Sequence, residues 1–123
     1  MKSITREEAP IAIEGDGVEL RSTPVGGGMS TTFVRLPAGA DLRPATQGLE
    51  DDLCQCPHWG YMLSGRVRMH TGTGHQDFGA GESFYWGPGH APEALDDCEY
   101  VDFSPTDEFN HVISHITGAA APA

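Results

Sequence analysis

The sequence predicts an all-β protein, an antiparallel sandwich or barrel that one short helix closes. Sixteen glycines and nine prolines interrupt the chain at short intervals, in stretches such as "PVGGG", "LPAGA", "GAG" and "GPGHAP". This spacing of turn residues is typical of many short strands, and it leads us to expect about eight to ten of them. Helical spacing of apolar residues begins only after Pro105.

The expected strands lie between these turns and are rich in apolar and β-branched residues. In chain order they cover residues 17–23, 29–36, 58–63, 66–70, 75–79, 82–86 and 98–103. The runs 66–70 and 75–79 flank the segment "TGTG", so we expect a hairpin with a glycine turn there. The chain of 123 residues suits one domain. We therefore predict a single domain over residues 1–123, with a barrel core at about residues 17–104.

The expected helix covers residues 106–117 and closes the domain. Ser104 or Thr106 is a suitable N-cap, and acidic residues follow in the first turn. The apolar residues then recur at helical spacing, at Phe109, Val112, Ile113 and Ile116.

Charge and cysteine content limit the classes of partner and compartment. The formal net charge of −11 would repel phosphate backbones and anionic membranes, so we expect neither nucleic acid nor membrane as a partner. The three cysteines cannot all pair within one chain. The amino terminus lacks the apolar core of a signal peptide, and no run reaches the about 20 apolar residues of a membrane span. We therefore expect a cytoplasmic protein.

The segment "HWGYMLSGRVRMHTGTGHQDFGAGESFYWGPGHAPEAL" resembles the cupin superfamily of small antiparallel, jelly-roll-like β-barrels. The likeness covers roughly residues 29–104 and lies mainly in the order of its parts. A strand ends at "LSG", a hairpin follows, and "AGE", an apolar strand and "PGH" come next. The resemblance implies a cupin barrel that holds a metal ion in its mouth.

The ligand positions that the resemblance implies carry unusual residues. Counting back from Gly65 places His58 where the family has its glutamate ligand, and places Cys54 and Asp52 at the two preceding histidine positions. The last histidine position falls on Pro92, whose ring offers no donor atom, while the nearest histidine is His90. The resemblance therefore implies the place of a site but no particular activity.

The residues themselves also favour a metal site at the start of the strand 58–63. Positions of equal parity on a strand share a face, so Cys54, Cys56 and His58 would point the same way. Thiolate and imidazole together suit zinc, iron(II) or copper, with zinc or iron(II) favoured here. The candidate metal ligands are therefore Cys54, Cys56, His58 and His90, with Asp52 as a secondary candidate. The alternative is that the cysteines are small buried apolar residues.

The other soft side chains are weaker metal-ligand candidates. We interpret Cys98 as a packing residue or an idle thiol. His70 and His75 flank a hairpin turn, and His111 and His115 share a helical face without the glutamate of the protease motif. We interpret all four histidines as surface or interface residues.

If His58 faces inward, then Trp59, Tyr61 and Leu63 face outward. Side chains this apolar need a cover, which either the N-terminal strands or a partner subunit would provide. The resemblance favours the second alternative, a symmetric homodimer.

Two functions remain open from the sequence. The first is a metal-dependent enzyme that acts on a small organic molecule as an isomerase, a lyase or an oxygenase. The second is a non-catalytic cupin that binds a small ligand or senses metal or redox state. A barrel with buried thiols and no ligand is the remaining alternative. No nucleophile motif, phosphate loop or dinucleotide fingerprint is visible.

Overall fold

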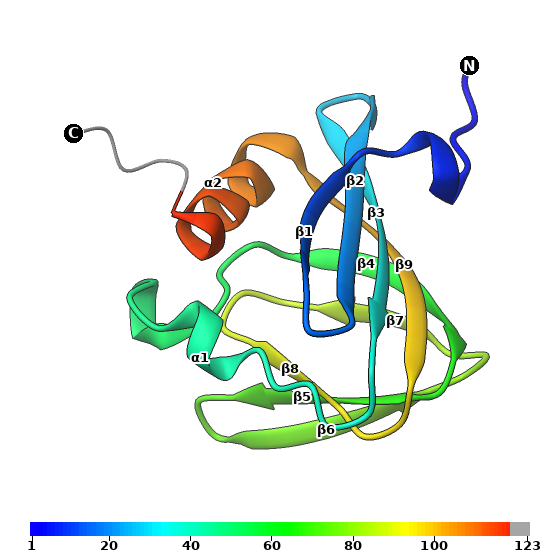
Figure 1. Ribbon diagram of the computed structural model, residues 1–123. Helices are drawn as coiled ribbons and strands as arrows, with labels where there is room; N and C mark the ends of the chain where they lie inside the picture. Colours follow the sequence, from blue (N-terminus) through cyan, green and yellow to red (C-terminus); the bar gives the residue numbers. More distant parts are fainter. Residues whose placement is uncertain (119–123) are drawn as a thin grey trace.

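The structure is a computed structural model that describes residues 1–118, and within them it contains two antiparallel sheets (Figure 1). The larger sheet has the strand order β1-β2-β3-β9-β4-β7, and the smaller has the order β6-β5-β8. Nine strands are found in this part of the chain: β1 (Ile11–Gly15), β2 (Val18–Gly26), β3 (Met29–Leu36), β4 (His58–Ser64), β5 (Arg66–Thr71), β6 (Gly74–Gly79), β7 (Ser83–Trp86), β8 (Ala91–Ala94) and β9 (Cys98–Pro105). The antiparallel barrel that the sequence predicts is confirmed.

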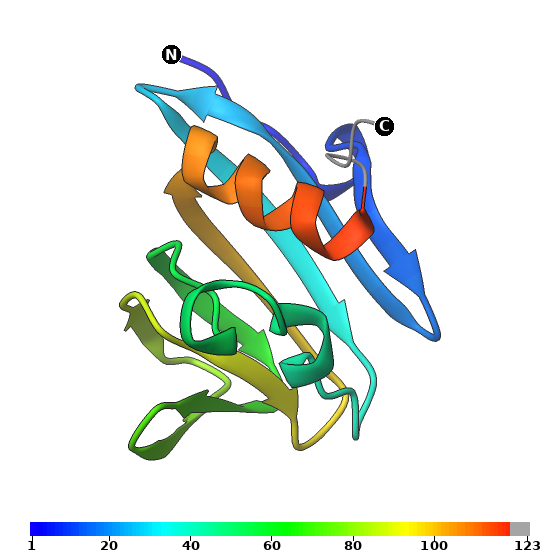
Figure 2. The same cartoon turned by 90° about the vertical axis from the view of Figure 1, so that its left-hand side faces the viewer.

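One longer helix and three short ones complete the described part of the chain. Helix α2 (Thr106–Thr117) follows β9 directly and lies across a face of the larger sheet (Figure 2). The short helices are η1 (Arg6–Glu8), α1 (Arg43–Thr46) and η2 (Glu50–Asp52). Phe109 and Val112 are the buried residues of α2. The predicted C-terminal helix is thus confirmed, and its apolar spacing faces the barrel.

The predicted strands agree with the structure, but the prediction omits β1 and β8. Strand β8 has the sequence "APEA". A proline argues against a strand in a sequence pattern, so the pattern does not predict this strand. It is the edge strand of the smaller sheet, where Pro92 pairs with Met69 without having to donate a hydrogen bond on its outer side. The preceding loop covers that outer side, because Leu42 N donates to Pro92 O at 2.9 Å and Ala94 N donates to Ala40 O at 2.8 Å.

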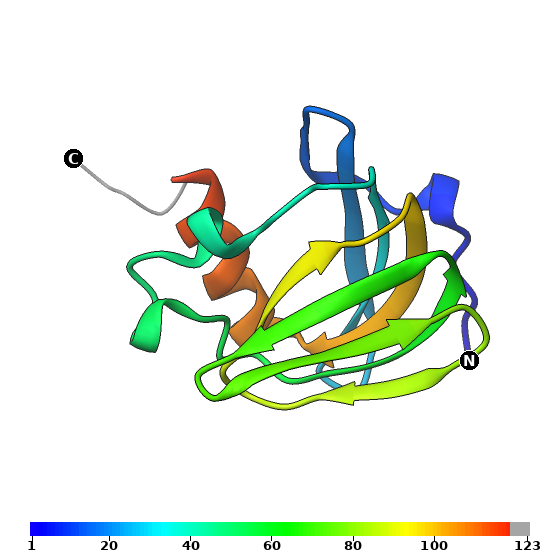
Figure 3. The same cartoon turned by 90° about the horizontal axis from the view of Figure 1, so that it is seen from below.

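The two sheets enclose the core (Figure 3). Alternation is clearest in β9, where every second residue is buried. Most residues on this inner face are apolar or small, but one of them is Asp102, which is only 3% exposed. A carboxyl group is rarely buried among apolar residues, because burial without a partner is costly. The space around Asp102 is therefore a candidate functional site.

The turn between β4 and β5 requires glycine. Gly65 has φ +72°, and a Cβ added there would collide with the carbonyl oxygen of Asp97. The glycine that fixes the register of the sequence resemblance is therefore also the residue that allows β4 to turn into β5.

The outward side chains of β4 are exposed, as the sequence predicts. Trp59, Tyr61 and Leu63 are 45%, 43% and 49% exposed, and they share this face with Tyr85 and Phe103. The alternative in which the N-terminal strands cover them is wrong, because β1 and β2 lie at the opposite edge of the larger sheet. Among residues 1–118, no helix is long and apolar enough to cross a membrane.

Candidate metal centre and its cavity

Three predicted ligands come together in the barrel: Cys54, His58 and His90. Each offers a ligand atom, and these three atoms all lie within 4.8 Å of one another. A backbone bridge joins Cys54 to His90, with Cys54 N donating to His90 O at 2.8 Å and His90 N donating to Cys54 O at 3.1 Å. His58 is the first residue of β4. All three side chains are buried.

Hydrogen bonds decide which ring nitrogen each histidine presents. His90 Nδ1 lies 2.6 Å from the carbonyl oxygen of Gly87, which can only accept, so Nδ1 carries the proton and Nε2 is free. His58 Nε2 lies 3.8 Å from the sulfur of Cys54. The two imidazole rings are 5.0 Å apart between centroids. The cluster therefore brings one sulfur and two imidazole rings together, with Nε2 of His58 toward the sulfur.

The geometry fits a tetrahedral metal ion. Zinc bonds of about 2.3 Å to sulfur and about 2.0 to 2.1 Å to nitrogen place the two ligand atoms about 3.6 Å apart at a tetrahedral angle. The observed separation between Cys54 Sγ and His58 Nε2 is 3.8 Å. Three protein ligands leave a fourth position, which is the pattern of a catalytic site rather than of a closed structural one.

Burial keeps the cluster uncharged when no ion is bound. It lowers the pKa of His58 to about 3, with a smaller contribution from His90, and it also lowers the pKa of His90. Burial raises the pKa of the Cys54 thiol to about 11. Both imidazoles therefore keep a lone pair for a metal at neutral pH. Metal binding requires only that Cys54 lose its proton.

Asp102 is a candidate functional residue that the sequence reasoning missed. Its Oδ1 lies 3.7 Å from His58 Nδ1, and neither atom has a hydrogen-bond partner. Burial raises the pKa of Asp102 to about 8, so at neutral pH the pair consists of a carboxylic acid and a neutral imidazole rather than two ions. The signal in the sequence was the alternation in "CEYVDFS", which puts Asp102 on the inner face with Tyr100.

Cys56 and Asp52 do not join the cluster. Cys56 is 1% exposed, but its sulfur lies 3.6 Å from Pro57 O, and it lines a separate cavity beside α2. Burial raises the pKa of its thiol to about 12. The Asp52 side chain is exposed and accepts a hydrogen bond from Gly48 N at 2.9 Å. Three of the five predicted ligands are therefore adjacent, and two are not.

The remaining soft side chains lie elsewhere. Cys98 is a buried free thiol. His75 is exposed, His111 lines the separate cavity beside α2, and His115 Nε2 donates to Gln47 O at 2.7 Å. His70 bonds to Glu93. None of these residues reaches the cluster.

A cavity of about 60 Å³ opens beside the cluster and includes its three residues in its wall. Helix α2 forms part of the wall, and the ring of Phe109 lies 5.6 Å from that of His58 between centroids. The full lining is Leu20, Thr32, Val34, Leu42, Thr46, Cys54, His58, Met69, Trp86, His90, Pro92, Tyr100, Asp102, Phe109, Val112 and Ile116. The wall is thus largely apolar, with a few polar groups close to the candidate ligands.

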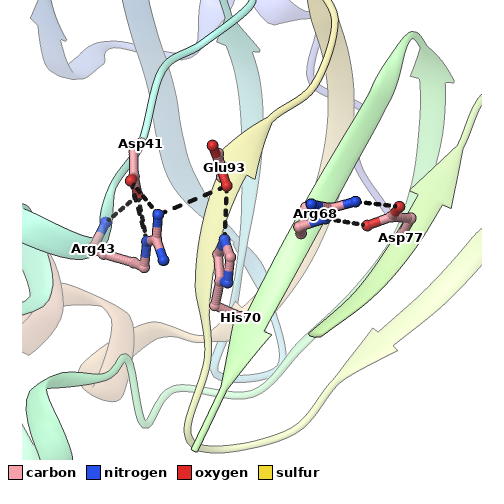
Figure 4. Close-up of polar contacts among 6 residues, drawn as sticks. All are labelled: Asp41, Arg43, Arg68, His70, Asp77 and Glu93. Atoms are coloured by element: carbon pink, nitrogen blue, oxygen red, sulfur yellow. Dashed lines mark hydrogen bonds and ion pairs between the residues drawn. The ribbon is translucent and has the colours of Figure 1, made fainter. Parts of the chain in front are cut away.

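A polar network on the outer face of the smaller sheet holds the segment that carries Leu42 and Thr46 (Figure 4). Arg43 Nη2 lies 2.7 Å from Asp41 Oδ2 and 3.8 Å from Glu93 Oε1. Glu93 also bonds to His70 Nε2 at 2.8 Å. These contacts fasten the start of α1 to β8 and β5, and so fix one side of the cavity wall.

Comparison with known proteins was made by sequence and by structure. No family model matches the sequence, and no curated protein matches it. Among solved structures, oxalate decarboxylase from Bacillus subtilis matches with a TM-score of 0.60 and 18% identity, over 83% of this chain and 28% of that one. KdgF from Halomonas sp. matches with a TM-score of 0.60 and 16% identity, over 85% of this chain and 94% of that one.

An RmlC-like cupin from Shewanella frigidimarina gives a TM-score of 0.59 at 15% identity, over 83% of this chain and 88% of that one. The chain spans only about 28% to 32% of the length of the oxalate decarboxylases that it matches. At these identities the likeness shows the fold alone, and that fold is the cupin barrel.

Proposed function

We propose that this cupin-fold chain is a metal-dependent enzyme acting on a small organic molecule. Cys54, His58 and His90 would hold a divalent transition metal, and the adjoining cavity would receive the substrate. The observation that carries the proposal is the convergence of three buried ligand atoms within 4.8 Å, in the wall of a cavity. When bound, the ion supplies a Lewis acid that polarises an oxygen of the substrate or activates water or dioxygen.

The chain's own residues have distinct tasks in this proposal. The Gly87 carbonyl fixes the His90 ring by accepting from Nδ1, and the Asp102 carboxyl faces Nδ1 of His58. Such outer partners orient ligating imidazoles in metal sites generally. Phe109 and the rest of the inner face of α2 exclude bulk water from the same space.

The ligand types favour zinc or iron(II). Oxalate decarboxylase from Bacillus subtilis has Mn(II) centres. A cysteine thiolate is a soft ligand, whereas manganese prefers carboxylate, carbonyl and water oxygens. The soft thiolate of Cys54 therefore supports a softer ion than manganese in this chain.

The second candidate function is a non-catalytic cupin that binds a small ligand or senses metal or redox state. The feature that favours it is the size of the cavity, about 60 Å³, which leaves little room for a substrate and a second reactant together. Turnover assays with small carbonyl and hydroxy compounds, with and without a chelator, separate the two functions. Binding without any chelator-sensitive turnover would favour the second function.

Metal analysis tests the proposal directly. Protein purified without a nickel column should contain close to one zinc or iron per chain, and Cys54→Ser and His58→Ala should each lose most of it. Cys98→Ser is the matched control, because Cys98 is equally buried but lies outside the cluster. Wild-type protein without bound metal, and without uptake of zinc or iron(II) on dialysis, would overturn the proposal.

A further inference from the structure

The cavity wall contains three buried polar atoms that lack a hydrogen-bond partner. They are His58 Nδ1, Trp86 Nε1 and Asp102 Oδ1, and all three residues line the cavity. Their side chains are between 3% and 6% exposed. His58 Nδ1 and Asp102 Oδ1 lie 3.7 Å apart and face each other, whereas Trp86 Nε1 has no hydrogen-bond partner among the described residues. Buried polar groups are nearly always paired, so Trp86 Nε1 indicates that a ligand with an acceptor group belongs there. Trp86 Nε1 can only donate, so the group that pairs with it must be an acceptor such as a carbonyl or hydroxyl oxygen.

No cationic side chain lines the cavity. The chain has seven Lys and Arg residues, and every one of them lies outside the lining: Lys2, Arg6, Arg21, Arg35, Arg43, Arg66 and Arg68. A carboxylate or phosphate group in the cavity would leave water without an Arg or Lys to pair with it, and it would lie near the carboxyl group of Asp102. Burying an unpaired charge is costly, so in the metal-free protein this wall selects against anions.

The rest of the wall is shaped for an alkyl group. Leu42 from the start of α1 and Phe109, Val112 and Ile116 from α2 form one apolar side, and Leu20 and Val34 extend it onto the larger sheet. The cavity measures about 60 Å³. At roughly 10 to 15 Å³ for each water-sized occupant, this volume takes about four to six non-hydrogen atoms.

We infer that the cavity binds a small uncharged organic molecule with one carbonyl or hydroxyl oxygen and a branched alkyl body. The oxygen accepts from Trp86 Nε1, and the alkyl body lies against Leu42 and α2. This inference rests on the proposed function for the statement that such a molecule is the substrate. Binding itself requires only the cavity and is independent of the ion.

A matched ligand pair tests the inference. Methyl isopropyl ketone and isobutyrate have nearly the same shape, but only isobutyrate is charged. Amide NMR titrations of metal-free protein at neutral pH should show the ketone binding at least about tenfold more tightly, with shifts at Trp86 and in α2. Equal or tighter binding of isobutyrate, or no binding of either compound at millimolar concentration, would overturn the inference.

Two variants of α2 locate the binding. Ile116 lines the cavity and is half-buried, so Ile116→Phe should fill the space and weaken ketone binding by at least about tenfold. Ile113 is also half-buried on the same helix but lies outside the lining, so Ile113→Phe should leave ketone binding unchanged. Equal effects of the two substitutions on ketone binding would place the ligand elsewhere and overturn the inference.

Zinc and iron content, measured on the same samples, separates this inference from the proposed function. Ketone preference in a protein that takes up neither zinc nor iron(II) would leave the inference standing and overturn the metal centre. Zinc uptake with no ketone preference would leave the metal centre standing and overturn the inference.

Discussion

Asp102 Oδ1 lies 3.7 Å from Nδ1 of His58, and each of these two buried atoms lacks any other partner. The two residues reach this position from different strands, because Asp102 is on β9 and His58 begins β4. The distance is slightly too long for a hydrogen bond, and a small movement of either side chain would close it. A closed bond in which His58 Nδ1 donates to Asp102 Oδ1 would leave Nε2 toward Cys54 without a proton.

We expect Asp102 to position His58 for metal binding. Asp102→Leu removes the acceptor, so cobalt affinity should fall about ten- to a hundredfold, the usual effect of losing an outer partner of a ligating histidine. Asp102→Asn keeps an acceptor oxygen in a side chain of similar size, so its cobalt affinity should fall less. Cobalt titration followed by visible absorption measures both. Wild-type affinity in Asp102→Leu would show that the carboxyl group has no role in holding the ligand.

The stability of the metal-free protein should fall as the pH rises above 6.5. Burial raises the pKa of Asp102 from its ordinary value of 3.8 to about 8, so between these values the unfolded chain releases a proton that the folded chain keeps. His58 has the opposite effect, because its folded pKa of about 3 lies below the ordinary 6.5, and stability is lost as the pH falls through that range. Above pH 6.5 the Asp102 effect dominates.

Urea unfolding between pH 6.5 and 8 measures this dependence. The free energy of unfolding of the wild type should decrease by about 1.4 kcal/mol per pH unit, as an order of magnitude, and that of Asp102→Asn should change much less. Parallel curves for the two proteins would mean that Asp102 is ionised in the folded state. The Cys54, Cys56 and Cys98 thiols do not interfere in this range, because their ordinary pKa of 9.0 already lies above pH 8 and burial raises it further.

Cobalt spectra should distinguish the two cysteines of "CQC". Only Cys54 has its sulfur in the cluster, so the sulfur-to-cobalt charge-transfer band should vanish in Cys54→Ala and persist in Cys56→Ala. The two substitutions remove equally buried thiols and serve as each other's control. A band lost only in Cys56→Ala would require Cys56 to turn from Pro57 O toward the ion.

The homodimer expected from the sequence remains a prediction, and the outer face of β4 is where we expect it to form. Trp59, Tyr61, Leu63, Tyr85 and Phe103 are 41% to 56% exposed there, and the rings of Trp59 and Tyr85 lie 5.3 Å apart between centroids. A contiguous apolar face of this kind usually marks an interface. Light scattering at micromolar concentration should give a dimer mass, and Tyr85→Lys should give a monomer.

Ile11→Lys is the control for this experiment. Ile11 is 43% exposed on β1, at the other edge of the same sheet, so its substitution should leave the dimer intact. A monomeric wild type would contradict the prediction.

Local pattern predicted most of the fold but only part of the site. Alternation and glycine turns identified seven strands and the outward aromatic face, because these signals depend on near neighbours in the chain. Parity correctly predicted that Cys54, Cys56 and His58 are all buried, but it did not show that Cys56 lines a different cavity, because β4 begins only at His58. The adjacency of Cys54 and His90, and the approach of Asp102 to His58, arise from pairing between distant segments, which no local pattern encodes.

The backbone bridge between Cys54 and His90 fixes the positions of these two candidate ligands whatever side chains they carry. Its two hydrogen bonds involve only backbone atoms, so they would survive a change of either side chain. Substitution at position 54 could therefore exchange the donor atom and alter the preferred ion while the scaffold stays in place. Cys54→His would replace a soft donor with a harder one and move the preference away from thiophilic metals. In evolutionary terms, a barrel built in this way can change its metal by single substitutions without having to refold.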